Sequence, residues 1–371
     1  MNRFMIDLDG LDALIRALEQ AGFQVVGPVW ERGAVRLRPI RSAADLPQGI
    51  SDEQAPGRYR ASAAGDLLFG YAVGPSSLKE ALFPPRRTLW EATLSDGGWR
   101  FEAVPADQRP LAVIGARPCD VAAVAVQDRV LLDGSYVDPD YARRRDSLFV
   151  VAVNCTVPAA TCFCASMGTG PDATGGPGRF DLALTELRDG SGHRFIGTVG
   201  SDAGADFLEN IPTVVAADDD VAAVDHLLEA AGQQARRLDT DGLSGWIVDH
   251  PEHPRWDAIA ERCLACGNCT AVCPTCFCVS TEPSMSLDGS VASMDRRWDS
   301  CYSLDFTFMG GRPVRSSVKS RYRQWLTHKV GTWQEQFGQL GCVGCGRCIT
   351  WCPAGIDLTA EIAAMRETSD A

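Results

Sequence analysis

The sequence lacks the long apolar runs and the positive charge that suit membranes and nucleic acids. No apolar run reaches the roughly 18 residues of a membrane-spanning helix. The first residues, MNRFMID, lack the charged-then-apolar order of a secretory signal peptide. The formal net charge of −13 disfavours nucleic acid and anionic membrane surfaces as partners. We therefore expect a cytoplasmic protein with no membrane span and no nucleic-acid partner.

The common signatures of catalysis and of nucleotide binding are missing as well. No Gly-x-Gly-x-x-Gly fingerprint follows a predicted strand. The glycine-rich segment 167–178 follows a cysteine-containing loop instead, so we interpret it as a flexible loop. Neither a Ser–His–Asp arrangement nor a His-Glu-x-x-His metal motif stands out. If a nicotinamide or a flavin takes part, we expect it on a partner subunit.

Cysteine, in contrast, is abundant. Fifteen cysteines in a chain with no export signal indicate metal ligation in preference to disulfides. Eight of them form two runs with the same C-x2-C-x2-C-x3-C-P spacing, which is the bacterial pattern for [4Fe–4S] clusters. The first run is Cys263, Cys266, Cys269, Cys273 and Pro274, and the second is Cys342, Cys345, Cys348, Cys352 and Pro353.

The spacing of the two runs also predicts which thiolates share a cluster. Three thiolates separated by two residues reach the same cube, whereas the fourth points away and ligates the other cluster in two-cluster folds. The alternative is a pair of zinc knuckles, but zinc usually takes two C-x2-C pairs or histidine, and neither run contains a histidine. We predict one cluster on Cys263, Cys266, Cys269 and Cys352, and another on Cys342, Cys345, Cys348 and Cys273.

The N-terminal half contains a strand–helix–strand pattern. Residues 111–115 (LAVIG) and 148–153 (LFVVAV) are short buried-type strands, and a helix that begins near Pro118 lies between them. This order within about forty residues predicts a βαβ unit with parallel strands. The carboxyl ends of parallel strands share one edge of a sheet, where ligands usually bind.

Four further cysteines follow those two strands. Cys119 comes after the first strand and Cys155 after the second, and Cys162 and Cys164 lie on the loop just beyond. We therefore hypothesise a third cluster on Cys119, Cys155, Cys162 and Cys164. The alternatives are buried thiols that act as small hydrophobes, a zinc site on the same residues, or a cluster in which Asp120 replaces one thiolate.

Three cysteines and a basic stretch lie between the two runs. Cys276, Cys278 and Cys301 are expected either to pack around the neighbouring cluster or to donate to the third site. The basic residues of 312–329 have three possible interpretations: a solvated face, a counter-charge for the clusters, or a docking surface for an acidic partner. His328 is interpreted as a structural hydrogen-bonding residue.

The 371 residues suffice for two domains. We expect an α+β fold, with an N-terminal mixed α/β domain that contains the βαβ unit over 1–245, and a helical dicluster [4Fe–4S] ferredoxin-like domain over 246–371. Strands are predicted over 23–29, 34–39 and 67–73, hairpins over 88–104 and 180–199, and helices over 9–21, 77–83, 221–238 and 358–365. Segment 42–65, broken by proline and glycine, is predicted to be irregular.

Several motifs in combination resemble those of a known family. They occur at 115–120 (GARPCD), 154–171 (NCTVPAATCFCASMGTGP), 273–278 (CPTCFC), 321–329 (RYRQWLTHK) and 341–348 (GCVGCGRC). Together they resemble the iron–sulfur β subunit of soluble NAD(P)-linked [NiFe] hydrogenases, the sulfhydrogenases, and the related A subunit of anaerobic sulfite reductase. The resemblance spans nearly the whole chain and is strongest from about 110 to 355.

The resemblance implies a place in a larger complex. A flavin subunit that carries FAD would bind NAD(P)(H), and the clusters would carry electrons to the small and large [NiFe] hydrogenase subunits. The chain would then be an electron-transfer subunit of an oxidoreductase complex, with no catalytic residues of its own. The alternatives are the A subunit of an anaerobic sulfite reductase, a flavin reductase that acts alone, and a zinc-stapled interaction scaffold.

Overall fold

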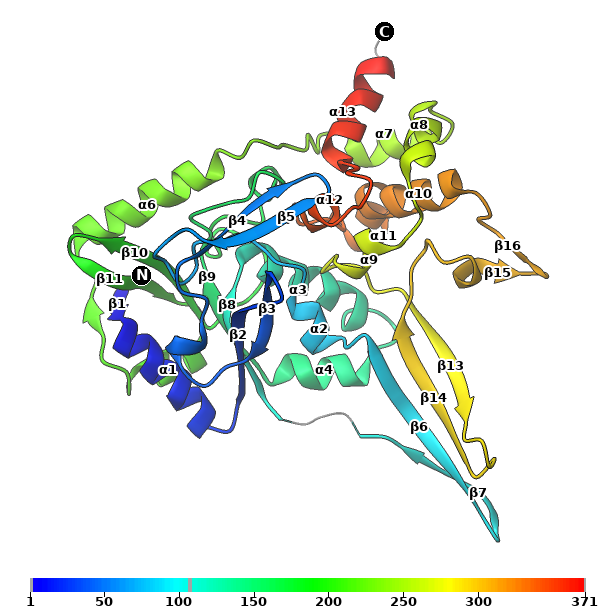
Figure 1. Cartoon of the computed structure of the whole chain (residues 1–371), viewed down its shortest axis with the longest axis horizontal. Coiled ribbons are helices and arrows are strands. Elements are labelled where there is room, and N and C mark those ends of the chain that lie inside the picture. The colour runs from blue at the N-terminus through cyan, green and yellow to red at the C-terminus, as the bar shows by residue number, and fades with distance from the viewer. Residues whose placement is uncertain (1–2, 106–108, 370–371) are drawn as a thin grey trace.

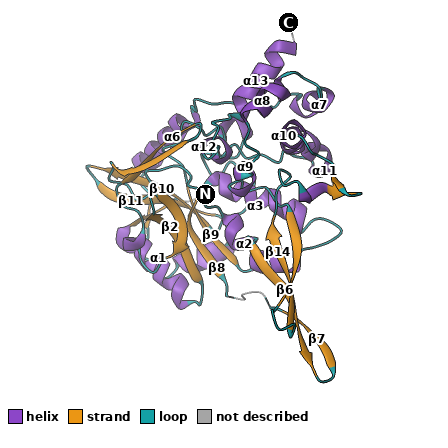
Figure 2. Cartoon of the chain, turned by 45° about the vertical axis from the view of Figure 1, so that its right-hand side comes forward, coloured by secondary structure: helices purple, strands orange, loops and turns teal. Residues whose placement is uncertain are grey.

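The computed structural model describes residues 3–105 and 109–369 (Figure 1). Its body is a large sheet with helices on both faces, and the helices of the C-terminal third gather beside that body (Figures 1 and 2). An arm of paired strands projects away from both (Figure 1). The fold is therefore α+β, as the sequence predicts. No helix of the described residues is long and apolar enough to cross a lipid bilayer.

The large sheet has eight strands in the order β12-β1-β11-β10-β9-β8-β2-β3. Strands β8 and β9 are parallel neighbours, and α3 (Pro118–Leu131) and α4 (Pro139–Asp146) connect them, which confirms the βαβ unit. Strand β2 runs parallel to β8, and β10 runs parallel to β9. The strands are β1 (Phe4–Asp7), β2 (Gln24–Glu31), β3 (Ala34–Pro39), β8 (Leu111–Ala116), β9 (Leu148–Val153), β10 (Leu182–Asp189), β11 (Gly192–Val199) and β12 (Val214–Val215).

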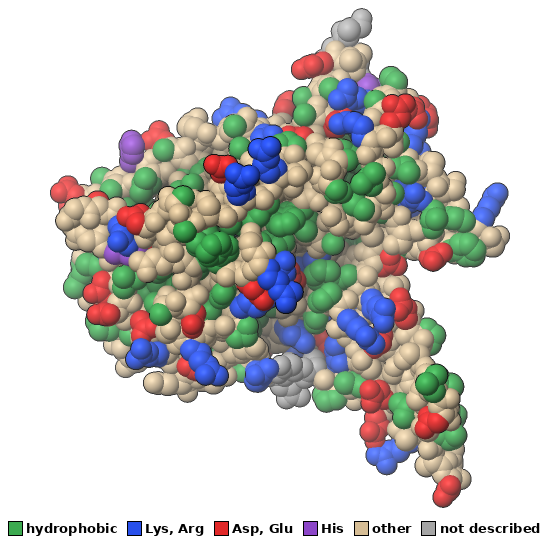
Figure 3. All heavy atoms as spheres, viewed as in Figure 1, with side chains coloured by type: hydrophobic (Ala, Val, Ile, Leu, Met, Phe, Trp, Pro, Cys, Tyr) green, Lys and Arg blue, Asp and Glu red, His purple; other side chains and the backbone are tan. Residues whose placement is uncertain are grey.

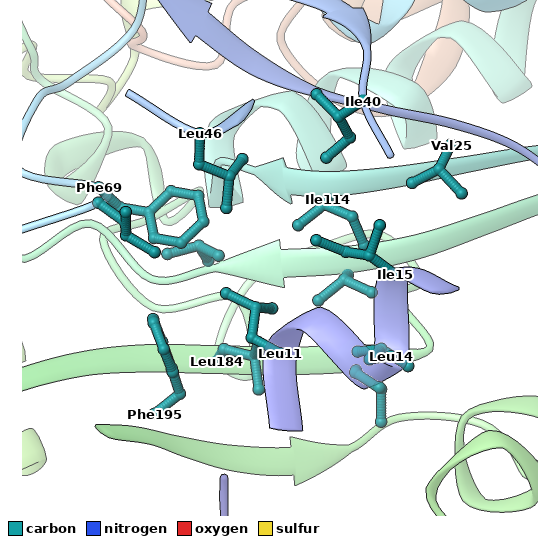
Figure 4. Close-up of a cluster of buried hydrophobic side chains, with 14 of the residues drawn as sticks. Leu11, Leu14, Ile15, Val25, Ile40, Leu46, Phe69, Ile114, Leu184 and Phe195 are labelled. Atoms are coloured by element: carbon teal, nitrogen blue, oxygen red, sulfur yellow. The ribbon is translucent and has the colours of Figure 1, made fainter. Parts of the chain in front are cut away.

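Each face of the sheet is buried under helices because the central strands are apolar on both sides. Helix α1 (Leu8–Gln20) covers one face, and its buried residues Leu11, Leu14 and Ile15 point toward the sheet (Figure 4). Helices α2 (Leu78–Leu82), α3 and α4 contribute to the core of the other face. Alternate residues of one strand enter the two cores, since Ile114 belongs to the first and Val113 to the second.

Two predicted segments in the N-terminal half are wrong. Segment 42–65 contains a hairpin, β4 (Ile50–Ala55) with β5 (Arg58–Ala63), in place of an irregular chain. Segment 67–73 is not a strand, because charged side chains take the hydrogen-bonding groups that a strand would use. The carboxylate of Glu186 accepts from the backbone N–H groups of Leu68 and Phe69, and Arg117 donates to the carbonyl of Phe69 at 2.7 Å.

The projecting arm joins strands from both halves of the sequence. The predicted hairpin β6 (Arg86–Ser95) with β7 (Gly98–Ala103) pairs with a second hairpin, β13 (Val279–Met285) with β14 (Val291–Trp298). Acidic, basic and hydrophobic side chains intermix on its visible face (Figure 3). The C-terminal part is therefore less purely helical than expected, because the segment between the cysteine runs forms this hairpin and the short pair β15 (Phe308–Met309) with β16 (Arg312–Pro313).

The remaining helices cover the sheet edge or pack around a second core. Helix α5 (Asp202–Leu208) lies near α1, and α6 (Asp218–Gly232) ends earlier than the predicted 238. The second core includes Trp256, Trp325 and Leu326, with cysteines of both runs at its margin. Its helices are α7 (Leu243–Asp249), α8 (Arg255–Arg262), α9 (Asn268–Ala271), α10 (Val318–Thr327), α12 (Arg347–Thr350) and α13 (Leu358–Ser369). Helix α11 (Trp333–Phe337) packs instead in a separate cluster with Cys119 and Cys345.

Candidate metal centres

The first cysteine run begins in the loop between α8 and α9, continues through α9 with Cys269 and ends at Cys273. Positive φ angles at Ala265 (49°) and Gly267 (75°) wind this loop tightly, and the N–H of Ala265 donates to Cys263 Sγ at 3.4 Å. The loop opens into a pocket of about 450 Å³, counting its mouth. The pocket is lined by Cys263, Cys266, Cys269 and Cys352, the set predicted for one cluster, which we call site 1.

Three buried donors line the same pocket. The hydroxyl of Tyr322 and the indole N–H of Trp325 form no hydrogen bond within the described residues, and the hydroxyl of Tyr302 interacts with the Cys269 thiol. A buried donor without a partner costs about 1–3 kcal/mol. Thiolate and sulfide acceptors in the pocket would remove that penalty, so the lining fits an iron–sulfur cluster. Sequence reasoning missed these three residues; the only signal was the density of aromatics in 298–333.

A second group of thiols, which we call site 2, lies next to site 1. It consists of Cys273, Cys342, Cys345 and Cys348. Burial, followed by the thiols of Cys342, Cys345 and Cys273, raises the pKa of Cys348 well above its usual range. Cys348 also lines the pocket of site 1. The two groups of thiols are therefore neighbours, and each contains one cysteine from the other run.

Glycines hold the second run against the N-terminal half. Gly344 and Gly346 have φ angles of 63° and 74°. A Cβ at Gly344 would lie 2.7 Å from backbone atoms of Cys164, and one at Gly346 would lie 2.4 Å from the carbonyl oxygen of Thr161. The N–H of Phe163 donates to the Gly344 carbonyl at 2.8 Å. Only glycine permits this close approach, which brings site 2 to the cysteines of the N-terminal half.

Lys329 is buried beside site 2. It lies in a π-helical turn, His328–Thr332, and its Nζ donates to Cys273 Sγ at 3.2 Å, to Thr275 Oγ1 at 2.9 Å and to the Gly341 carbonyl at 3.1 Å. Burial by itself would lower the pKa of Lys329, but the thiolates of Cys273 and Cys276 raise it well above its ordinary value. Among the roles considered for the basic stretch, the position of Lys329 favours charge balance at the cysteines.

The N-terminal quartet of Cys119, Cys155, Cys162 and Cys164 lies near Cys345 of site 2. Burial, then the thiols of Cys155 and Cys164, raises the pKa of Cys162 well above its usual range. Burial also raises the pKa of Cys119, which has Cys345 and Cys164 among its neighbours. Gln234 donates to Cys164 Sγ at 3.1 Å. The thiols of Cys155, Cys162 and Cys164 thus lie together, and Cys119 lies near both Cys164 and Cys345.

Asp120 and the three remaining cysteines have other neighbours. The Asp120 carboxylate pairs with Arg347 at 2.9 Å, so it already has a cationic partner. Cys276 hydrogen-bonds to the thiol of Cys273, and Cys278 and Cys301 affect each other's pKa. This placement favours the packing role for these cysteines. The ring of His328 packs on Phe277 and Trp333.

The donor chemistry distinguishes a cube from a single ion. Four thiolates at about 2.3 Å from one zinc ion would lie within roughly 4 Å of one another. No set of three or more His, Cys, Asp or Glu side chains in residues 3–105 and 109–369 has that arrangement. Burial raises the pKa of the thiols of Cys342 and Cys348, and a bound metal would supply positive charge that favours their thiolate forms.

Comparisons with known proteins agree with this geometry. A family model described as a 4Fe–4S dicluster domain matches residues 262–356, which include both cysteine runs. The sulfhydrogenase 2 subunit beta of Pyrococcus furiosus is 30% identical over 357 residues, which cover 94% of this chain and 94% of that protein. No solved structure matches the chain.

Proposed function

Because the chain belongs to the family of sulfhydrogenase β subunits, we propose that it carries electrons between a flavin subunit that binds NAD(P)(H) and a [NiFe] hydrogenase module. The chain is an iron–sulfur electron-transfer subunit that binds [4Fe–4S] clusters. Clusters of this type supply one-electron transfer when bound. The partners we propose are a subunit that carries FAD and the small and large hydrogenase subunits.

The observation that carries the proposal is the serial arrangement of the thiols. Cys348 borders both site 1 and site 2, and Cys345 is a neighbour of Cys119, Cys162 and Cys164. Each group of thiols therefore has a member close enough to affect the pKa of a thiol in the next group or to border its pocket. We propose that Cys263, Cys266, Cys269 and Cys352 hold one cluster, that Cys273, Cys342, Cys345 and Cys348 hold a second, and that Cys119, Cys155, Cys162 and Cys164 hold a third.

One end of this series reaches the protein surface. Cys266 is exposed, and the adjacent Leu264 is 67% exposed. All cysteines of the quartet are buried, as are Cys273 and Cys345 of site 2. Electron exchange requires close approach of the partner's cofactor, so we assign the contact with one partner to the face around Leu264 and Cys266.

The test is anaerobic purification of the native complex, with analysis of its metals, flavin and subunits. Nickel and flavin in a complex that contains this chain support the proposal. Sirohaem in place of nickel would instead select the A subunit of an anaerobic sulfite reductase. Iron analysis of the isolated chain adds the cluster count, with about eight irons expected for two clusters and about twelve for three. Flavin in the isolated chain, with reduction by NAD(P)H, would indicate a reductase that acts alone and contradict the relay.

A further inference from the structure

We propose that Lys329 makes site 2 easier to reduce than site 1. This inference rests on the proposed placement of clusters at both sites, and it adds an order of reduction that the placement alone does not give. Lys329 would not take part in electron transfer itself. Its positive charge would act on site 2 through the hydrogen bond to the sulfur of Cys273.

The contacts of Lys329 leave none of its N–H groups free. Nζ donates to one sulfur, one hydroxyl and one carbonyl, at 3.2, 2.9 and 3.1 Å. The sulfur belongs to Cys273, and the carbonyl belongs to Gly341, the residue before Cys342. The ammonium is thus held between the cysteine that comes from the first run and the start of the second run. Three satisfied donors hold the ammonium in this position.

No carboxylate offsets this charge. Lys329 is 3% exposed, and within residues 3–105 and 109–369 it forms no ion pair with Asp or Glu. A buried cation without a counter-ion is strongly unfavourable. The sulfur groups beside it are the available counter-charge, and the attraction increases when one more negative charge enters the site. Burial leaves this attraction almost unscreened by salt.

Site 1 has a different lining. The donors that face its pocket are neutral, namely the two tyrosine hydroxyls and the indole N–H of Trp325. Guanidinium groups also lie near site 1, since Arg262 shares the Glu361 carboxylate with Arg255 and the buried Arg321 acts on the pKa of Cys263. The side-chain contact of Arg321 goes to the Ser316 carbonyl and that of Arg262 to Glu361, whereas Lys329 donates directly to a ligand sulfur. Neutral donors stabilise added negative charge less than a full ammonium in contact with a ligand sulfur does. Reduction by one electron, without a proton, therefore favours site 2.

The experiment is an anaerobic redox titration of the full chain with dithionite, followed by EPR, on wild type and on variants of one residue. Lys329→Gln keeps a donor for Cys273 but loses the charge, and Lys329→Met loses both. Lys319→Met is the matched control, because Lys319 carries the same charge on α10 and pairs with Asp257 at 3.0 Å near the surface. We expect one EPR signal to change in both Lys329 variants. At a fixed potential, the ratio of its reduced to its oxidised form should fall at least tenfold, which corresponds to a 59 mV lower reduction potential for a one-electron couple. The control should match wild type.

The possible results separate this inference from the proposed function. If wild type contains no iron or shows no EPR signal after reduction, the proposed clusters themselves are wrong. If the signals and the iron content are intact and neither Lys329 variant shifts a signal, only the role of Lys329 is overturned. If Lys329→Gln loses iron, Lys329→Arg decides the question. Iron retained by the arginine variant supports the charge role, and equal loss in both variants contradicts it.

Discussion

Arg347, from the second cysteine run, forms a buried ion pair with Asp120, from the first turn of α3. Its Nη2 donates to Oδ2 at 3.0 Å and lies 2.9 Å from Oδ1. The same guanidinium donates to the carbonyls of Gly74 and Ser76. The pair therefore fastens the C-terminal cysteine run to the βαβ unit, and it fixes Cys345 beside Cys119.

Removal of Arg347 should destabilise the contact between the two halves. Arg347→Met leaves the Asp120 carboxylate buried without its cation, which we expect to lower the stability by about 3–5 kcal/mol. The measurement is the thermal unfolding midpoint of anaerobic protein with unchanged iron content. Arg100→Met is the control, because Arg100 forms an exposed pair on the arm. A double variant, Arg347→Met with Asp120→Leu, should recover much of the loss, and a midpoint equal to wild type in the single variant would contradict the prediction.

Loss of Cys155 tests the third cluster. Cys155→Ala should lower the iron content by about four atoms per chain, because a cube needs all four thiolates. Iron and sulfide analysis of anaerobic protein gives the number. The control is Cys301→Ala, because Cys301 lies outside the proposed ligand sets and none of the quartet thiols is among the causes of its pKa shift. Unchanged iron in folded Cys155→Ala protein would remove the third cluster from the chain.

The hydroxyl of Tyr322, which has no partner in the described residues, leads to two predictions for Tyr322→Phe. The iron-free chain should become more stable, whereas site 1 of the iron-loaded chain should become harder to reduce. Tyr322→Phe removes a buried hydroxyl that has no partner in the described residues, so the iron-free chain should gain about 1–3 kcal/mol of stability. In the iron-loaded chain the same change removes a donor to sulfur, so site 1 should become harder to reduce. Unfolding of the iron-free chain and an EPR titration measure the two effects. Tyr136→Phe, at an exposed tyrosine, should change neither, and equal effects in both variants would refute the idea.

The exposed leucine beside site 1 tests the contact with a partner. Leu264→Asp should weaken electron exchange within the assembled complex by roughly tenfold, or ~1.4 kcal/mol, because a charge replaces an apolar contact at the edge of the pocket. Stopped-flow reduction of the complex by NAD(P)H measures the rate, with iron content as the check on the clusters. Leu287→Asp is the control, since Leu287 is fully exposed at the tip of the arm. If the two variants slow exchange equally, the face around Leu264 is not the contact.

Local sequence patterns were sufficient for the elements whose signals lie within a few residues. Helix α1, the β6–β7 hairpin and the βαβ unit were predicted because periodicity and turn residues specify them locally. The failed segment 67–73 shows the limit. Its apolar composition suits a strand, but Glu186, more than a hundred residues later in the chain, takes its N–H groups.

The sequence by itself determined the chemistry, because fixed intervals of two and three residues between thiols and a following proline define the donor set of each run. Only the tertiary structure decided how those sets lie relative to one another. Contacts such as Gly344 with Phe163 and Arg347 with Asp120 join residues far apart in the chain, and no local spacing encodes them. Burial likewise decided the role of Lys329, since a basic stretch looks the same in sequence whether its charges face water or sulfur.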